Sequence, residues 1–381
     1  MLISVRNRCS DFSTYRAARV KSLFNVETGA NFSIDAKLPV EDKDWKIGVI
    51  VGPSGSGKTS IGRQIWEDVK IYNGDEGWST DKPIVDDISP NGDFDSVTNA
   101  LSAVGLGDVP AWLRPYHALS NGEKFRAGLA RVIAEGRDRV IIDEFTSVVD
   151  RQIAKIGASA FSKSWKRVGG QAILLSCHYD ILDWLEPDWV FDTRTKELER
   201  GCLRRRPKFD LEIFKTNGNF WRFFEPHHYL KLPRMVAAQY YVGVVDGELV
   251  AHIAFSPFLE INGMRGCRMV TMPEWQGAGI GTRFLNETSR LQFTDVNKFY
   301  ERVKAVYFHT SHPGLCAALR RSKKWRQISQ SLFGGDKVKS RKEIEKTRKK
   351  KTNSLTTTGY GGHMRAVQGF KTTLALLTQG K

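Results

Sequence analysis

The chain of 381 residues has few cysteines, and their arrangement excludes two kinds of stabilising site. Its five cysteines are scattered and never form a Cys-x-x-Cys pair, so neither a disulfide framework nor a zinc site is expected. Long apolar runs are missing too, since no stretch reaches the roughly 20 residues that a membrane-spanning helix needs. The N-terminus lacks the sustained apolar stretch and the cleavage site of a secretory signal. We therefore expect a cytoplasmic protein without a membrane segment.

Acidic residues are scarce in the second half of the chain. Residues 201–381 hold 32 Lys and Arg against 13 Asp and Glu, a net charge of +19, whereas residues 1–200 hold 26 against 29. A basic excess confined to one half favours an acidic partner, nucleic acid first and an anionic surface or acidic protein second. A solvated lysine-rich face is the alternative.

The length of the chain predicts two domains, because one hydrophobic core rarely serves 381 residues. The run GCLRRRPKF, which begins at residue 201, combines glycine, proline and three arginines and suits an exposed connection. The extension after residue 335 is a candidate to complete the sheet of the second domain. We place an α/β domain at residues 1–200, a basic linker at 201–207, a second α/β domain at 208–335 and a basic C-terminal extension at 336–381.

The first half contains a glycine-rich phosphate-binding pattern. The apolar run at residues 45–51 predicts a strand, the next residues fit GxxxxGK[ST] at each fixed position, and TSIGRQIW predicts a helix. In this pattern backbone N–H groups surround the phosphates, the lysine neutralises their oxygens, and the threonine hydroxyl binds Mg²⁺. We therefore predict an ATP site made of Gly52, Pro53, Ser54, Gly55, Ser56, Gly57, Lys58, Thr59 and Ser60.

Two carboxylates end the next predicted strand, which runs from Arg139 to Asp143. We expect Asp143 to bind Mg²⁺ together with Thr59, and Glu144 to orient or deprotonate the water that attacks the phosphate. Such a pair alone is often a solvated strand end, but the phosphate loop favours the functional interpretation. A third apolar run, Gln171 to Ser176, continues a pattern of buried parallel strands.

Three further motifs resemble those of ABC-type ATPases. Leu119-Ser120-Asn121-Gly122-Glu123 resembles the LSGGQ signature, Ser147 to Asp150 resembles the D-loop, and Cys177-His178 takes the place of the switch histidine. The resemblance covers about residues 20–195. It implies that Ser120, Gly122 and Asp150 bind ATP and that His178 takes part in hydrolysis. It also implies that ATP closes a head-to-tail homodimer, in which Ser120 contacts the γ-phosphate bound by the other subunit.

The first half departs from that family in ways that affect its function. Asn121 and Glu123 replace glycine and glutamine of the signature, and no glutamine lies between residues 64 and 152 to serve as the Q-loop residue. Asp86 and Asp87 are the candidates to replace it. The segment from 60 to 118 is short, which leaves little room for the helical arm that couples transporters to their membrane partners. Transport is therefore disfavoured.

The second half has a glycine-rich turn of its own. Residues 270–281, VTMPEWQGAGIG, carry Q-x-x-G-x-G after an apolar stretch and lead into the predicted helix TRFLNETSRLQF. Asp246-Gly247 predicts a β-hairpin before the turn, and Ala305 to Phe308 predicts a strand after it. This order resembles the GNAT superfamily of acetyl-CoA-dependent acyltransferases over about residues 208–330. A plain glycine turn is the alternative.

The GNAT resemblance implies a site for acetyl-CoA or a related acyl-CoA. Backbone N–H groups of the turn and of the helix start would bind its pyrophosphate, with help from the helix dipole. Val270 and Met272 would lie on a splayed strand and face the pantetheine arm. The cofactor residues that the resemblance implies are Val270, Met272, Gln276, Gly277, Ala278, Gly279, Ile280 and Gly281.

Two clusters offer groups for acyl transfer. His228 and Tyr229 precede the hairpin and are candidates to line the acceptor site. Ser311 and His312 follow the predicted strand, at the position where a leaving thiolate would be protonated. Loop-capping or interface roles are an equal alternative for all four residues.

Taken together, these motifs predict an ATP-dependent acyltransferase that modifies a base of DNA or RNA, because some mobile-element relatives of the GNAT superfamily modify DNA bases. One alternative is an ATP-regulated N-acetyltransferase acting on a protein, a small molecule or aminoacyl-tRNA. Another is a mechanical DNA-binding ATPase whose GNAT-like fold has lost catalysis. The basic second half favours a nucleic-acid substrate, and the intact glycine turn disfavours the mechanical alternative.

Overall fold

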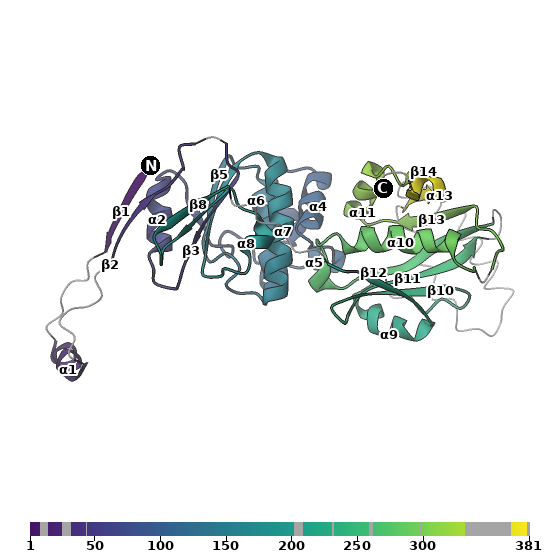
Figure 1. Ribbon diagram of the computed structural model, residues 1–381, viewed down its shortest axis with the longest axis horizontal. Coiled ribbons are helices and arrows are strands. Elements are labelled where there is room, and N and C mark those ends of the chain that lie inside the picture. The colour runs from purple at the N-terminus through teal and green to yellow at the C-terminus, as the bar shows by residue number, and fades with distance from the viewer. Residues whose placement is uncertain are drawn as a thin grey trace. The chain divides into compact units, whose positions relative to one another are not determined.

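The computed structural model describes residues 1–7, 14–24, 32–42, 44–201, 209–230, 232–258, 262–297, 299–331 and 367–378 (Figure 1). The expected basic linker beyond residue 201 and the lysine-rich part of the C-terminal extension lie outside these ranges. The chain forms two compact units. The first comprises residues 1–81, 87–89 and 116–207, and the second comprises residues 82–86, 90–115 and 208–381. Residues 90–115 thus pack with the second unit although they precede the signature-like motif.

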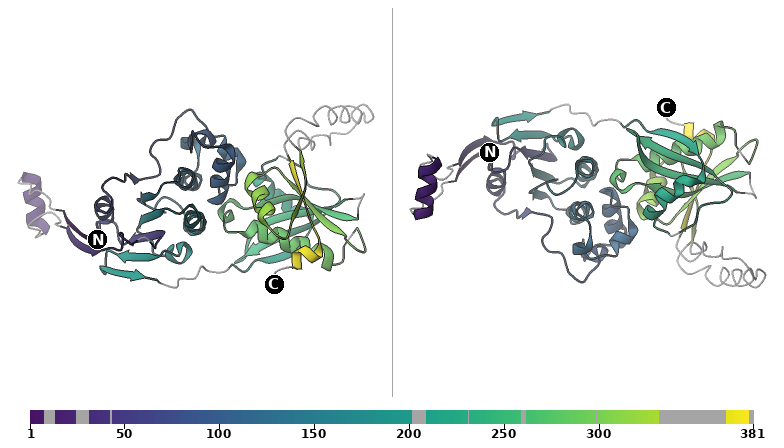
Figure 2. Two further views of the ribbon diagram at one scale, coloured as in Figure 1. Left: turned by 90° about the horizontal axis from the view of Figure 1, so that it is seen from above. Right: turned by 90° about the horizontal axis from the view of Figure 1, so that it is seen from below.

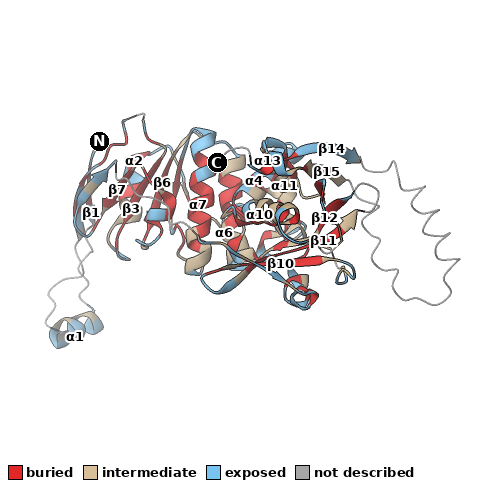
Figure 3. Ribbon diagram, turned by 45° about the vertical axis from the view of Figure 1, so that its right-hand side comes forward, coloured by how far each residue is buried: buried red, intermediate tan, exposed pale blue. Residues whose placement is uncertain are grey.

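The first unit is built on a six-stranded sheet, counted over the described ranges, with the order β4-β5-β6-β3-β7-β8. Its first five strands are parallel, and β8 runs antiparallel to β7. The central strand β3 is buried along its whole length, as an apolar run covered on both faces should be. Figure 3 shows that β6 and β7 are also largely buried, each with one partly exposed residue at an end. The predicted α/β class and the strands predicted around residues 47, 140 and 173 are confirmed.

Two helices of this unit, α6 and α7, begin at side-chain caps. The longest, α7, starts where the Asp150 carboxylate accepts a hydrogen bond from the N–H of Ile153, and it ends at Gly169 in the left-handed conformation. The antiparallel pair β1–β2 buries Ile3 and Ile34 against the core that also holds α2. The elements of the first unit are β1 (Leu2–Asn7), α1 (Tyr15–Phe24), β2 (Phe32–Lys37), β3 (Ile47–Val51), α2 (Lys58–Ile65), β4 (Ile71–Tyr72), α6 (Asn121–Ala134), β5 (Arg139–Ile142), α7 (Arg151–Val168), β6 (Gln171–Ser176), α8 (Leu182–Leu185), β7 (Trp189–Asp192) and β8 (Glu197–Arg200).

The second unit is built on a seven-stranded sheet, again counted over the described ranges, with the order β14-β15-β13-β12-β11-β10-β9. Among its pairs only β12 and β13 are parallel in the part of the chain that the structure describes. The predicted hairpin is confirmed, because Asp246 and Gly247 join β10 to β11 with φ values of +50° and +82°. Strand β15 comes from the C-terminal extension and lies between β13 and β14; its yellow ribbon lies among the green strands in Figure 2.

Helices α4 and α5, which precede the signature-like motif in the sequence, belong to the second unit. Helix α4 packs against α11, and α10 covers β11 and β12. Helix α3 (Ile84–Asp87) lies where the chain passes between the two units. Across the described ranges the helices are all too short or too polar to span a bilayer. The other elements of the second unit are α4 (Phe94–Ala103), α5 (Val109–Trp112), β9 (Glu212–Thr216), α9 (Trp221–Phe224), β10 (Gln239–Val245), β11 (Glu248–Phe258), β12 (Gly263–Thr271), α10 (Ile280–Thr294), β13 (Ala305–Thr310), α11 (Pro313–Arg321), β14 (Arg326–Ser331), β15 (Val367–Thr372) and α13 (Leu374–Thr378).

Candidate functional site

The glycine-rich loop of the first unit connects β3 to α2, as its sequence predicts. At Gly52, φ is +153°, and a Cβ atom there would overlap the hydroxyl of Thr193. That hydroxyl also lies 2.6 Å from Ser56 Oγ, so Thr193 holds the loop at two points. Gly55 and Gly57 have φ values of +76° and +85°, which favour glycine. Only a loop without side chains at these positions follows this path, which leaves its backbone N–H groups at the start of α2 for an anion.

The residues that would hold Mg²⁺ come together at the carboxyl end of the sheet. Thr59, in the first turn of α2, donates a hydrogen bond to Asp143 Oδ2 at 2.8 Å, although the two residues are 84 positions apart. Lys58 Nζ donates to the carbonyl oxygens of Gly52 and Pro53 at 2.9 and 2.8 Å. A hydroxyl and a carboxylate beside a lysine suit a magnesium ion and the phosphates that it accompanies. Ser54 is exposed on the loop, and Ser60 follows Thr59 in the helix.

Glu144, the predicted hydrolytic residue, has an unusual backbone. Its φ is +49°, that of Thr146 is +71°, and its N–H donates to Asp143 Oδ1 at 2.9 Å. Two non-glycine residues so close together in the left-handed region cost free energy, about 1–3 kcal/mol each. The strained turn leaves the Glu144 side chain exposed while Asp143 stays partly buried.

His178 lies beside the same turn. Its Nδ1 is 3.3 Å from the hydroxyl of Thr146, a residue that the sequence did not single out. Burial lowers the pKa of His178, and the positive charge of Arg151 lowers it further, against the opposing charges of Asp180 and Glu144. A neutral imidazole can accept or donate a proton near pH 7. The structure thus brings the predicted Glu144 and His178 to one edge of the sheet.

The signature-like motif begins helix α6. Ser120 is its N-cap and forms a capping box with Glu123, whose carboxylate accepts hydrogen bonds from the N–H and hydroxyl of Ser120 at 2.8 and 2.9 Å. A glutamine could accept the same hydrogen bonds through its amide oxygen, and the carboxylate of Glu123 adds a negative charge that the start of a helix favours. Gly122 contacts α7, where a Cβ atom would lie 2.7 Å from Ile153 Cδ1. Asp150 caps α7, so the predicted signature and D-loop residues both stand at helix starts.

A buried arginine on α6 was missed by the sequence analysis. Arg131 stacks on Trp78, with its guanidinium carbon 3.5 Å from the ring centre, and it donates to the carbonyl oxygen of Asp87 at 2.8 Å. The carboxylate of Asp87 lies 3.4 Å from the guanidinium and accepts a hydrogen bond from the N–H of Ser79 at 2.7 Å. Asp87, a candidate to replace the Q-loop glutamine, is thus engaged inside the first unit. Asp86 belongs to the second unit.

Comparison with known proteins finds relatives of the first half. The cytochrome c biogenesis ATP-binding export protein CcmA of Paracoccus denitrificans is 36% identical over 86 residues, which are 23% of this chain and 39% of that protein. The hemin import ATP-binding protein HmuV of Rhodococcus jostii is 41% identical over 63 residues, 16% of this chain and 21% of that protein. The first half of the chain contains an ABC-type ATPase domain. The chain spans less than half the length of these curated relatives.

Solved structures resemble the ABC-type ATPase domain more distantly. The dimeric bacterial ABC transporter cassette MJ0796 is 11% identical and covers 45% of this chain and 92% of its own, with a TM-score of 0.36. No family model matches the chain.

The glycine turn of the second unit connects β12 to α10, as predicted, but its glutamine is engaged. Gln276 accepts a hydrogen bond from the N–H of Gly107 at 2.9 Å and donates one to the carbonyl oxygen of Thr271 at 3.1 Å. Gly277, before Ala278, has a φ of +90°. Gly279, with a φ of +82°, has no neighbouring atom within 4 Å of a Cβ position, so this side of the turn is open.

The other cofactor residues that the GNAT resemblance implied surround this turn. Val270 and Met272 are buried, and Ile280 is buried at the start of α10. Gly281 packs against β12, because a Cβ atom there would lie 2.9 Å from the hydroxyl of Thr271. The side chains of Val270 and Met272 therefore contact the protein core. The backbone of β12 remains available to a ligand.

His312 is held by contacts within the second unit. Its Nδ1 accepts a hydrogen bond from the N–H of Leu315 at 3.3 Å, and its Nε2 donates to the carbonyl oxygen of Gly107 at 3.1 Å. Burial lowers the pKa of His312, so the imidazole is neutral at pH 7. Both ring nitrogens are thus engaged. If His312 protonates a leaving thiolate, as predicted, one of these two hydrogen bonds must first break. Ser311 precedes His312 in the same turn.

Two other histidines, His228 and His252, pack against helix α9. His228 is buried, with Nδ1 2.8 Å from the carbonyl oxygen of Leu230, and its ring stacks on Tyr229 with the centroids 4.9 Å apart. His252 on β11, which the sequence analysis missed, is fully buried beside the ring of Trp221. Its Nδ1 donates to the carbonyl oxygen of Arg268, whose φ is +55°. Burial lowers the pKa of His252 to about 4.

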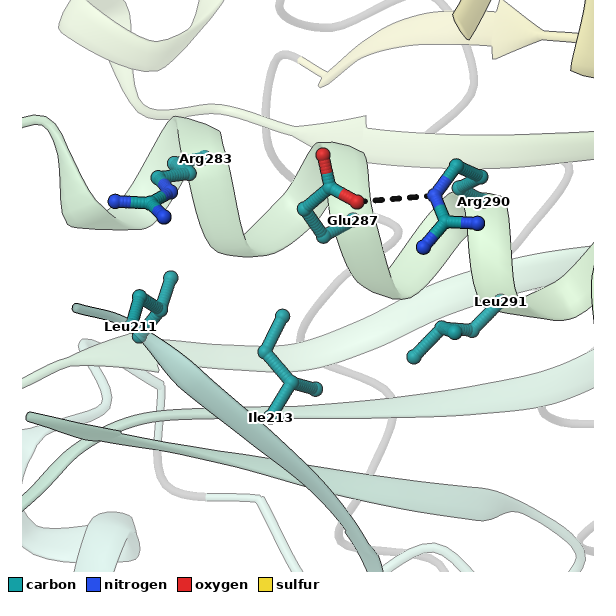
Figure 4. Close-up of a pocket in the computed structure, with 6 residues that line it drawn as sticks. All are labelled: Leu211, Ile213, Arg283, Glu287, Arg290 and Leu291. Carbon is teal, nitrogen blue, oxygen red and sulfur yellow. Dashed lines mark hydrogen bonds and ion pairs between the residues drawn. The ribbon is translucent and has the colours of Figure 1, made fainter. Parts of the chain in front are cut away.

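One described pocket lies between β9 and α10, with a cavity volume of about 360 Å³ (Figure 4). Arg290 pairs with Glu287 at 3.0 Å, and Arg283 donates to the carbonyl oxygen of Phe209 at 2.8 Å. The charged side chains of Arg283, Glu287 and Arg290 are therefore already engaged with other groups of the protein. The lining residues are Leu211, Ile213, Arg283, Glu287, Arg290 and Leu291.

Proposed function

We propose that the ABC-type ATPase domain binds Mg²⁺ and ATP and hydrolyses ATP, and that the second unit transfers an acyl group from a thioester to nucleic acid. The observation that carries the first part is the 2.8 Å hydrogen bond between Thr59 and Asp143. It joins the phosphate loop to the acidic end of β5, where Thr59 and Asp143 would hold Mg²⁺, which would neutralise charge on the phosphates of ATP. Lys58 would neutralise the phosphate oxygens, as a P-loop lysine does.

Glu144 would orient or deprotonate the attacking water. Its side chain is exposed beside Asp143 because the turn carries it there with a φ of +49°. His178, 3.3 Å from Thr146 on the same turn, would hold this edge of the sheet around the γ-phosphate. Ser120 would contact the nucleotide of a second subunit, so ATP would favour a dimer.

The experiment that tests the ATPase proposal is Glu144→Gln. We expect the variant to bind Mg²⁺-ATP with wild-type affinity, to lose at least about 100-fold in hydrolysis rate, and to form a dimer with ATP in size-exclusion chromatography. Glu197→Gln, the same change at an exposed position of β8, is the matched control and should hydrolyse ATP normally. Wild-type turnover in Glu144→Gln would refute the assignment.

Two features of the second unit support a thioester site. Strands β12 and β13 pair only from Gly263 to Gly266 and from Ala305 to Phe308, and beyond this β13 continues its pairing with β15. Ligands of parallel strands bind where the strands separate at their carboxyl ends. The glycine turn follows this opening directly and starts α10, whose first N–H groups have no acceptor within the helix. Both features support the pyrophosphate site implied by the GNAT resemblance.

Charge supports nucleic acid as the acceptor. Residues 201–381 carry a net charge of +19. Within the described part of this half, the turn from α11 to β14 reads RRSKKWR and exposes four cations that carry no acidic residue between them. Such a cluster binds phosphates without selecting sequence. The four residues are Arg320, Arg321, Lys323 and Arg326.

Fluorescence anisotropy over a salt series tests the acceptor class. Replacing Arg320, Arg321 and Lys323 with glutamine should lower the affinity for single-stranded DNA, double-stranded DNA and tRNA, and should reduce the salt slope by about one unit per lost contact. ATP hydrolysis should not change. An absence of binding to all three probes near 150 mM salt, combined with acyl transfer to protein after nuclease treatment, would instead support an ATP-regulated protein acetyltransferase.

A further inference from the structure

Residues 90–115, called the arm below, come from the sequence between the phosphate loop and the signature-like motif but pack within the second unit. The arm consists of α4, a loop and α5. Helix α4 lies on α11 so closely that a Cβ atom at Gly314 would overlap the side chain of Ser102. Trp112 of α5 packs on the ring of His312 with the centroids 5.8 Å apart.

The arm loop lies against the glycine turn of the second unit. Gly105 has a φ of +83°, and a Cβ atom there would overlap the carbonyl oxygen of Gln276. The next glycine, Gly107, donates its N–H to Gln276 Oε1 at 2.9 Å and accepts from His312 Nε2 at 3.1 Å. One backbone hydrogen bond and one close approach thus fix Gln276, the first residue of the turn, and the Gly107 carbonyl holds the arm loop to His312. The open side at Gly279 is untouched.

The chain leading into the arm is fixed inside the ABC-type ATPase domain. Arg131 binds the carbonyl oxygens of Glu76 and Asp87 at 3.2 and 2.8 Å and pairs with the Asp87 carboxylate. Its side chain is almost fully buried, so this contact is well shielded from water. Arg131 belongs to α6, the helix that starts at Ser120. A movement of α6 is therefore passed to the chain from which the arm extends.

We propose that the arm couples nucleotide binding in the ABC-type ATPase domain to the conformation of the glycine turn at Gln276–Gly281, and so to its affinity for the acyl thioester. The proposal rests on the proposed ATP and thioester sites. When ATP draws Ser120 toward a second subunit, α6 moves, and Arg131 carries Asp87 and the root of the arm with it. The contacts of Gly105 and Gly107 then shift the turn. Coupling of this kind is reciprocal, so the thioester changes the affinity for ATP by the same factor.

Hydrogen exchange of peptides covering residues 276–281 tests the coupling without a thioester. Full-length Glu144→Gln protein is compared with and without Mg²⁺-ATP, after calorimetry has measured nucleotide binding. We expect ATP to change the exchange rate of the turn at least about fivefold, and the change to disappear in Gly105→Ala. Gly247→Ala is the matched control, because its φ is +82° and no atom lies within 4 Å of its Cβ position. It should keep the full change.

A second variant covers the case in which Gly105→Ala does not fold. Gly314→Ala suits a helix but presses α4 away from α11, and it should remove the same exchange change. Nucleotide binding without an exchange change at the turn would overturn the coupling, as would an unaltered change in either variant. Calorimetry with coenzyme A then separates the two proposals. If coenzyme A does not bind while the exchange change persists, the thioester proposal falls, and the coupling between nucleotide binding and the conformation of the turn stands without it.

Discussion

The two glycine turns of this protein have the same local plan and different surroundings. Each follows a strand and starts a helix at a left-handed glycine, Gly57 with a φ of +85° and Gly279 with a φ of +82°. Around the first turn the fold gathers Thr59, Asp143 and the hydroxyl of Thr193. Around the second it places the backbone of the arm. The strand-turn-helix plan thus creates N–H groups for an anion in both units, and the residues that fold around each turn decide what chemistry is available.

The largest effect is expected from removing the hydroxyl of Thr59, because its hydrogen bond to Asp143 distinguishes the first turn from the second. Thr59→Val keeps the shape of the side chain and deletes the hydroxyl that bonds Asp143 and would bind Mg²⁺. We expect ATP hydrolysis to fall by about 100-fold or more. Binding of coenzyme A to the second unit, measured without nucleotide, should be unchanged. A normal rate of ATP hydrolysis by Thr59→Val, measured by phosphate release, would contradict the proposed difference between the two turns.

A smaller effect is expected at the open side of the second turn. Gly279→Glu places a carboxylate where the pyrophosphate would bind, and repulsion should weaken coenzyme A binding at least about tenfold. Gly279→Ala is the control: it carries the same left-handed backbone cost, about 1–2 kcal/mol, without charge. It should bind coenzyme A far better than Gly279→Glu. Equal affinities in calorimetry would show that the turn is not the cofactor site.

What the sequence could predict differs between the turns for a physical reason. The strand, glycine-rich loop and helix around residues 47–65, together with β5, β6 and the Asp246-Gly247 hairpin, depend on patterns within a few residues, so the sequence predicted these elements correctly. Thr193 closes on Gly52 from 141 positions away, and no local pattern connects the two. The arm was missed because its α4 is an ordinary amphipathic helix. Helix α11, on which α4 packs, begins more than 200 residues later. An amphipathic pattern predicts which face of a helix is buried, but not which element covers that face.

The pH dependence of stability sharpens the comparison between the units. His252, with a pKa lowered to about 4 by burial, stays neutral in the folded second unit while the unfolded chain takes up a proton near pH 6.5. Stability should therefore be full above pH 6.5 and fall as the pH drops toward 4, by about 3 kcal/mol for this group. His312 and His178 shift in the same direction.

Urea denaturation of His252→Gln across that range measures the contribution of this one histidine. The residues around it, His228 and Arg268, remain in the variant. We expect the variant to lose less stability than the wild type between pH 6.5 and 4. Parallel pH curves for the two proteins would contradict the buried neutral state.

The smallest effect is expected at the start of α6. Ser120→Ala removes the capping box with Glu123 and should lower the free energy of unfolding of the first unit by about 1 kcal/mol. Ser120→Asn keeps a side-chain cap and should restore that stability.

Under the proposed dimer, Ser120→Arg should also abolish the ATP-dependent dimer in light scattering. A dimer that forms normally in Ser120→Arg would exclude a role for this serine in binding the partner's nucleotide.

The position of the arm has a consequence for biosynthesis. A ribosome finishes α4 about 210 residues before it reaches α11, the helix on which α4 rests. At roughly 5–20 residues per second, α4 waits about 10–40 s for its partner, with its apolar face uncovered. Strand β14 waits as well, because β15 joins it to the sheet only when residues 367–372 have been made. The second unit thus completes its fold only after residues 367–372 have been made. Chaperones that shield nascent apolar surface are expected to act on the arm.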